Sequence, residues 1–116
     1  STLSGGEAQR LKLASCLADE NKKSLQKTLF IFDEPTSGLH YSDIANFMKS
    51  IQKLINIGNS VIIIEHNTDL IKQADWLIDL GPEGGEGGGR ICFSGYPKDI
   101  ITKKGNKTGK YLKNKL

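Results

Sequence analysis

One stretch, residues 28–40, constrains the fold of this chain more than any other. It begins with four apolar residues rich in Phe and Ile, Leu29–Phe32, and so short a run is typical of a buried strand in a parallel sheet. Asp33 and Glu34 follow at once, and Pro35 ends the strand because it has no N–H to give the sheet. Open α/β sheets place their ligands at the carboxyl ends of such strands. The stretch therefore predicts an α/β fold with two carboxylates at a ligand-binding sheet edge.

Two adjacent carboxylates at such an edge repel each other unless a positive charge lies near them, so a bound Mg²⁺ is the natural interpretation. The pattern matches the Walker B element of nucleotide triphosphatases, in which the first acid serves the metal and the second faces the attacking water. This assigns Asp33 to the metal and Glu34 to catalysis. A strand that ends in a solvated acidic turn is the alternative, because short motifs often match by chance.

Composition narrows the class of protein. The 116 residues suffice for one small domain with a core, and 37% hydrophobic and 25% charged residues are typical of a soluble globular chain. No apolar run approaches the roughly 20 residues that span a bilayer, and the N-terminus has no signal-peptide pattern. We therefore expect a cytoplasmic protein that has no membrane partner. Because the chain starts without Met and inside a motif, we also expect it to be a piece of a longer protein.

The cysteines and the tail add two further expectations. Cys16 and Cys92 are far apart and have no CxxC partner, which predicts reduced thiols and no zinc site. The tail, residues 98–116, holds seven lysines against one acid, Asp99. Such a basic tail could contact nucleic-acid phosphates, but a solvated chain end is the more common explanation.

The first residues predict a helix whose amino end could hold phosphate. Ser4 is a good N-cap, Glu7 completes a capping box, and apolar residues at helical spacing extend the helix from Gly5 to Ala18. Free N–H groups, the Ser4 hydroxyl and two small residues, Gly5 and Gly6, suit a phosphate-binding helix end. An ordinary capped helix explains the same residues without a ligand.

Helices and strands alternate along the rest of the chain. We expect a helix capped by Ser42 and ended before Gly58, a buried strand at 60–65, a short helix capped by Asn67 or Thr68, antiparallel strands at 75–80 and 90–94, and a short helix from Pro97. His66 then follows the second strand, beside the carboxyl end of the first. The glycine-rich loop 81–89 is no dinucleotide fingerprint, because it joins two strands and carries two acids.

Several stretches together resemble one family. They are Leu3–Ala14, which resembles the signature motif of ABC-type ATPases, Asp33–His40, Ile64–Asn67, Asp79–Gly89 and the ending Thr108–Lys113. All five are similar to the UvrA family, the ABC-type ATPases of bacterial nucleotide excision repair. Residues 37–40 match the D-loop of ABC ATPases, although the ABC family at large has Asp at the position of His40.

The resemblance implies a role for each candidate residue. Asp33 would serve Mg²⁺, Glu34 would polarise the attacking water, and His66 would contact the γ-phosphate of ATP. Residues 4–7, which are Ser4, Gly5, Gly6 and Glu7, would bind a nucleotide held by the other half of a dimeric site. Residues 1–116 would be the C-terminal portion of the second nucleotide-binding domain, a partial P-loop NTPase domain.

The resemblance also implies cofactors and partners, which are ATP and Mg²⁺, a second nucleotide-binding half, a UvrA dimer partner, a UvrB-type protein and damaged double-stranded DNA. The sequence contains no GxxxxGK[ST] phosphate loop and no cysteine cluster for zinc, so we expect the isolated chain to be inactive. An ABC transporter ATPase and a non-transport regulatory ABC protein remain alternatives, since both share the core motifs.

Overall fold

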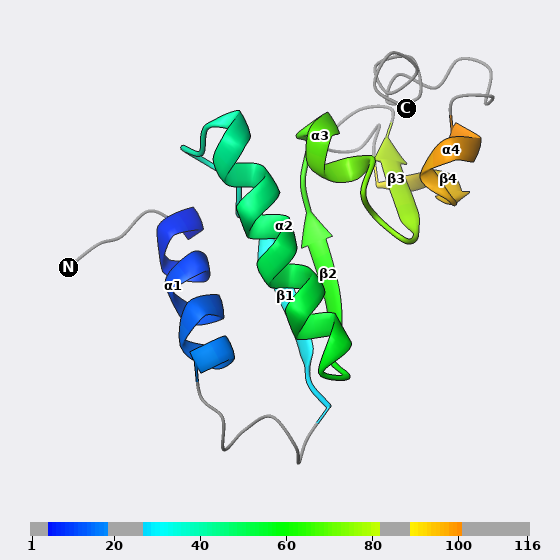
Figure 1. The fold of residues 1–116 in the computed structure, drawn as a ribbon. Coiled ribbons are helices and arrows are strands. Elements are labelled where there is room, and N and C mark those ends of the chain that lie inside the picture. The colour runs from blue at the N-terminus through cyan, green and yellow to red at the C-terminus, as the bar shows by residue number, and fades with distance from the viewer. Residues whose placement is uncertain (1–4, 19–26, 82–88, 101–116) are drawn as a thin grey trace. The chain divides into compact units, whose positions relative to one another are not determined.

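The computed structural model describes residues 5–18, 27–81 and 89–100. The chain divides into two compact units, Ser1–His66 and Asn67–Leu116, and each is described by itself (Figure 1). The predicted N-cap Ser4, most of the glycine-rich loop and the tail beyond residue 100 lie outside the described residues.

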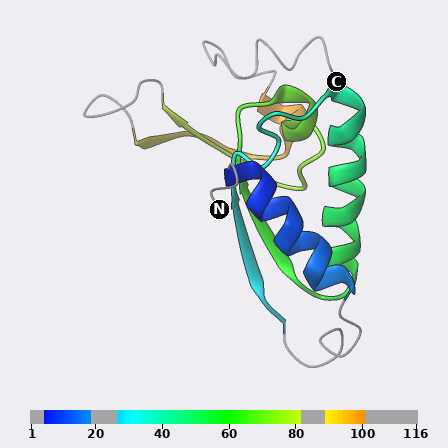
Figure 2. The ribbon, with the colours of Figure 1, turned by 90° about the vertical axis from the view of Figure 1, so that its left-hand side faces the viewer.

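The first unit consists of α1 (Gly5–Ala18), β1 (Leu29–Asp33), α2 (Tyr41–Asn56) and β2 (Ser60–Ile64). β1 and β2 pair in parallel, with Ile31 opposite Ile62 and Asp33 opposite Ile64. Figure 2 shows α1 and α2 side by side on one side of this strand pair. The predicted α/β class, the parallel strands and the bounds of the first helix are thus confirmed.

The core of this unit forms where α2 faces α1 and the strands. Apolar residues recur on one face of α2 at helical spacing, and four of them are buried, namely Ile44, Phe47, Ile51 and Leu54. Phe47 meets Phe32 of β1 edge-to-face, with ring centroids 6.0 Å apart. Leu13 is the buried apolar residue of α1. Full burial of one such side chain contributes about 1.5–3 kcal/mol, so this cluster anchors both helices to β1.

The strands are not buried on both faces, contrary to the prediction. Phe32 is buried, whereas Leu29, Ile31, Ile62 and Ile64 are exposed. Successive side chains of a strand point to opposite faces, and in the described part of the unit the helices cover only one face. The continuous apolar runs therefore reflect a sheet with apolar residues on both faces, of which one lies open here.

The structure contradicts the predicted N-cap of α2 and confirms the predicted end of the helix. The N-cap is His40, whose backbone is extended and whose carbonyl accepts from Asp43 N–H (3.0 Å), so the predicted cap Ser42 is wrong and lies inside the helix. His40 makes no side-chain cap hydrogen bond. At the other end Gly58 has φ 112°, which glycine adopts without steric cost, and the predicted stop is confirmed.

The second unit consists of α3 (Thr68–Ile71), β3 (Leu77–Gly81), β4 (Arg90–Gly95) and α4 (Pro97–Ile100). The β3–β4 pair is antiparallel, as predicted, but β3 begins at Leu77 rather than at residue 75. The predicted cap Asn67 is confirmed, because its side-chain oxygen accepts from Asp69 N–H over 2.9 Å. A small core of Ile71, Ile100, Leu77 and Phe93 joins the four elements.

None of the helices in the described ranges combines the length and the apolar character needed to cross a membrane.

Candidate functional site

The carboxyl ends of β1 and β2 bring the predicted acids and the predicted histidine to one edge of the sheet. Because the strands are parallel, Glu34, one residue past β1, comes close to His66, two residues past β2. Nδ1 of His66 lies 3.2 Å from Oε1 of Glu34. Both side chains are open to solvent, at 82% and 57% exposure. The structure thus joins two candidate residues that lie far apart in the sequence.

Glu34 has an unusual backbone conformation. Its φ is 48°, in the left-handed region that costs a residue with a side chain about 1–2 kcal/mol. Its N–H donates to the carbonyl of Ile64 over 2.8 Å, and its own carbonyl accepts from Ser37 N–H over 3.2 Å. These bonds hold the residue where β1 turns sharply away from the sheet. Such outliers gather at functional sites because the surrounding structure must enforce them.

A second glutamate, Glu65, lies between β2 and His66 and was not among the predicted site residues. Its side chain is only 3% exposed. Its Oε2 accepts from the hydroxyl of Thr36 over 2.6 Å, and its Oε1 accepts from the N–H of His66 over 3.1 Å. The sequence signal for Glu65 was a charged residue directly at the end of an apolar strand, next to the candidate histidine.

Gln9 of α1 is another residue that the sequence did not single out. Its side-chain amide donates to the carbonyl of Asp33 over 2.7 Å and accepts from the Asp33 N–H over 2.6 Å. The same Nε2 also lies 3.0 Å from the carbonyl of Gly5. The amide thus pairs with both backbone groups of Asp33, as a peptide group of a neighbouring strand would. It fastens the amino end of α1 to the carboxyl end of β1.

Gly6 and Arg10 fasten the same helix to the turn that follows β1. Nη1 of Arg10 donates to the carbonyl of Pro35 over 2.6 Å and to that of Ser37 over 3.1 Å. A Cβ on Gly6 would lie 3.3 Å from both carbonyl oxygens and 2.8 Å from that Nη1. Gly6 is therefore required for the close approach of α1 to the turn after β1, a role that its place in the sequence did not indicate.

The other residues of the predicted phosphate-binding helix end are less constrained. Gly5 and Glu7 are exposed at the start of α1, and a Cβ on Gly5 would come no closer than 4.0 Å to its neighbours. Ser4 lies outside the described residues. The exposed start of α1 leaves room for a ligand there.

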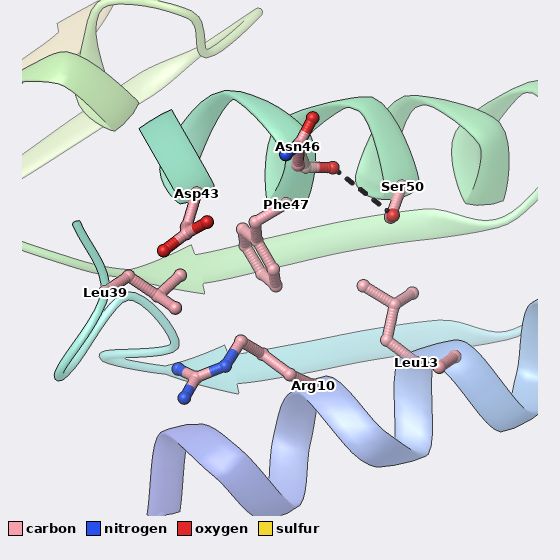
Figure 3. A pocket seen from close by; sticks show the side chains of 8 residues that line it. Arg10, Leu13, Leu39, Asp43, Asn46, Phe47 and Ser50 are labelled. Carbon is pink, nitrogen blue, oxygen red and sulfur yellow. Dashed lines mark hydrogen bonds between the residues drawn. The ribbon is translucent and has the colours of Figure 1, made fainter. Parts of the chain in front are cut away.

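A pocket of about 270 Å³ opens between α1 and α2. Its lining residues are Arg10, Leu13, Ala14, Leu39, Asp43, Asn46, Phe47 and Ser50. Figure 3 shows Phe47 reaching into the space between the helices, with Arg10, Leu39 and Asp43 gathered at one end. None of the predicted site residues lines this pocket, and the candidate site is the sheet edge, where Glu34 and His66 meet.

The sheet edge suits a metal ion that is shared with a ligand. Over the described ranges, no group of three or more His, Cys, Asp and Glu side chains is arranged to hold a metal ion. Mg²⁺ in nucleotide-hydrolysing proteins needs only one or two carboxylates, because phosphates and water complete its shell. The exposed carboxylate of Asp33 fits that donor set, and it is the residue that the sequence assigned to the metal.

Comparison with known proteins identifies relatives over nearly the whole chain, although no family model matches it. The chain is 59% identical over 115 residues to UvrABC system protein A of Neisseria meningitidis serogroup A. It is 56% identical over 115 residues to UvrABC system protein A of Staphylococcus aureus strain COL. Each match covers 99% of this chain, and the chain spans 12% of the length of these relatives.

A solved structure agrees with these matches. The crystal structure of UvrA2 from Deinococcus radiodurans superposes on the chain with a TM-score of 0.85 and 39% sequence identity, covering 98% of this chain and 14% of that one. These matches confirm the resemblance to the UvrA family that the sequence motifs indicated. Over its own length, the chain belongs to the UvrA family and corresponds to a segment of about an eighth of its relatives.

Proposed function

We propose that this chain supplies part of a nucleotide-hydrolysing site in a longer UvrA-type ATPase of DNA repair. The observation that carries the proposal is the 3.2 Å approach of His66 Nδ1 to Glu34 Oε1 at the carboxyl ends of two parallel strands. Ligands of open α/β sheets bind at this edge. Identity to UvrABC system proteins over nearly the whole chain supports ATP as the ligand.

Each side chain at the edge has a distinct task in this proposal. Asp33 would hold Mg²⁺, and the bound ion would supply positive charge to neutralise the phosphates. Glu34 orients the attacking water and accepts its proton. His66 is placed by Glu34 and donates a hydrogen bond to the terminal phosphate. Hydrolysis of this kind depends on positioning and charge stabilisation, so the exposure of Glu34 and His66 to an incoming ligand is a requirement.

The amino end of α1 acts on a second nucleotide. Ser4, Gly5, Gly6 and Glu7 offer N–H groups and a hydroxyl to a triphosphate bound by the other half of a dimeric site. Gln9 and Arg10 join this end to Asp33 and to the turn after β1 over 2.6–3.1 Å. Binding or hydrolysis of one nucleotide would therefore affect the site of the other nucleotide through α1.

The wider role follows the family. The chain would form the C-terminal part of the second nucleotide-binding domain of a cytoplasmic protein that dimerises, recognises damaged double-stranded DNA and engages a UvrB-type partner. We expect no zinc in this segment, because its two cysteines have no CxxC partner. The SOS response would be the natural setting for its expression.

The decisive experiment is Glu34→Gln in the full-length protein. The variant should still bind ATP but hydrolyse it about a hundredfold more slowly, the scale of a lost general base. Asp33→Asn should instead weaken Mg²⁺-dependent ATP binding. Asp75→Asn, at an exposed acid in the second unit, is the matched control and should leave turnover unchanged. Normal turnover by the Glu34→Gln protein would remove Glu34 from the mechanism.

A further inference from the structure

Glu65 is the most buried acid at the sheet edge and has no task in the hydrolysis described above. Its side chain is 3% exposed, against 57% for Glu34 and 82% for its neighbour His66. Burial of a carboxylate is unfavourable unless hydrogen-bond donors replace the lost water. Hydrogen-bond donors must therefore surround Glu65 in place of water.

The donors come from both strand ends. The hydroxyl and the N–H of Thr36 donate to Oε2 over 2.6 and 3.3 Å, and the N–H of His66 donates to Oε1 over 3.1 Å. Thr36 is itself buried, at 8% exposure, and lies 29 residues before Glu65. One carboxylate thus joins the turn that follows β1 to the residue that follows β2.

This link bears on the contact between the two candidate catalytic groups, the approach of His66 Nδ1 to Glu34 Oε1. Thr36 is two residues past Glu34, and His66 is one residue past Glu65. Nδ1 of His66 also lies 3.7 Å from Oε1 of Glu65, so the imidazole sits beside both carboxylates. A substitution that breaks the hydrogen bonds of Glu65 would therefore release both Glu34 and His66 from their positions.

We propose that Glu65 is a positioning residue, which fixes the backbone of His66 and the turn after Glu34 so that these two groups face the nucleotide together. The inference rests on the proposed function, since the pair has a task only if ATP is hydrolysed there. Glu65 itself touches neither nucleotide nor water in this scheme. Glu65 acts through Thr36 and through the His66 N–H. The left-handed backbone of Glu34, with φ 48°, lies in the turn that the hydrogen bonds from Thr36 to Glu65 hold in place.

The test compares three substitutions in the full-length protein. Glu65→Gln keeps the size of the side chain but replaces one accepting oxygen with an NH₂ group, which cannot accept from Thr36 or from the His66 N–H. Thr36→Val keeps the shape of threonine without its hydroxyl. Thr36→Ser keeps the hydroxyl and is the conservative rescue.

We expect Glu65→Gln and Thr36→Val each to lower kcat for ATP hydrolysis at least tenfold, with KM for ATP changed less than twofold. The double variant, Glu65→Gln with Thr36→Val, should lose no more kcat than either single variant, because the effects of residues that act as a unit are not additive. Thr36→Ser should keep kcat within twofold. If Glu65→Gln does not fold, the contrast in kcat between the Val and Ser variants at Thr36 still tests whether the hydrogen bond to Glu65 positions the site.

Three results would overturn the inference: normal kcat in the Glu65→Gln protein, equal losses in the Val and Ser variants, or losses that simply multiply in the double variant. Glu34→Gln, measured alongside, separates this inference from the proposed function. A slow Glu34→Gln protein with a normal Glu65→Gln protein rejects only the role of Glu65. A normal Glu34→Gln protein rejects the proposed function itself.

Discussion

The side-chain amide of Gln9 pairs with the backbone of Asp33 in both directions, accepting from its N–H over 2.6 Å and donating to its carbonyl over 2.7 Å. The two residues lie 24 positions apart. An amide side chain is the natural group for this task, because it carries a donor and an acceptor in the same geometry as a peptide. The helix that could reach one nucleotide is thereby bonded to the acid that could serve another.

Gln9→Ala should lower the stability of the chain by about 1–2 kcal/mol, since a typical hydrogen bond contributes about 0.5–1.5 kcal/mol net. Urea unfolding followed by circular dichroism measures the change. Gln52→Ala is the matched control, because the Gln52 amide donates to the Asn56 side chain on the exposed surface of α2. Equal losses in the two variants would show that the pairing with Asp33 adds nothing.

Gly6→Ala should destabilise the chain by about 1–3 kcal/mol, the usual cost of forcing atoms into a packed site. The new Cβ would lie 2.8 Å from Arg10 Nη1 and 3.3 Å from the carbonyls of Pro35 and Ser37. Gly5→Ala is the control for stability, because its Cβ would meet nothing closer than 4.0 Å. Thermal unfolding of both variants should show a lower Tm only for Gly6→Ala. Matching melting curves would mean that α1 does not pack against the turn as described.

The backbone of Glu34 predicts a trade between stability and activity. Neither Glu34→Ala nor Glu34→Gly can serve a water molecule, but only glycine adopts a φ of 48° without steric cost. The Gly variant should therefore be more stable than the Ala variant by about 0.5–1 kcal/mol, despite the greater freedom of glycine in the unfolded chain. Chemical denaturation of the two proteins checks this. A less stable Gly variant would indicate an ordinary backbone at this position.

The isolated 116-residue chain should not hydrolyse ATP and should bind it weakly at most. The sequence holds no GxxxxGK[ST] loop to surround the β- and γ-phosphates, and the carboxylates at the sheet edge repel phosphate unless Mg²⁺ lies between them. Calorimetric titration with MgATP and a phosphate-release assay measure both expectations. Tight binding would mean a nucleotide site that the described residues do not reveal.

Replacing Lys103, Lys104, Lys107 and Lys110 with Gln in the full-length protein should change DNA affinity little, since a run of this kind is more often a solvated chain end. Titration at several salt concentrations distinguishes the two cases. If these lysines contact DNA phosphates, the binding constant of the substituted protein should depend less steeply on salt than that of the original protein. A flatter slope would therefore assign the tail to DNA.

Local features of the fold could be predicted from the sequence. The stop at Gly58 and the cap at Asn67 depend on one residue and its near neighbours, so a pattern over a few positions suffices. The cap at Ser42 failed because the extended backbone of His40 already provides the first carbonyl of α2. Which of two nearby residues caps a helix depends on the incoming turn, and the side chain alone does not decide it.

The supporting contacts of the site could not be predicted in this way. Gln9, Arg10 and Glu65 act on backbone groups 24–29 positions away. Such pairs form only once the helix and both strands are in place, and many surface glutamines and glutamates look the same in sequence. Glu34 and His66 could be singled out as candidates because each lies within two residues of the end of a strand, which is a local signal.

The parallel pairing of β1 with β2 also sets an order of events during folding. The segment between Ile31 and Ile62 contains the whole of α2, so their pairing closes a long loop. Pairings of this kind form slowly. Helices form within about a microsecond, far ahead of such non-local contacts. We therefore expect α2 to appear first and Glu34 to meet His66 late, near the folding transition state or after it. Substitutions at this edge should then accelerate unfolding more than they slow folding.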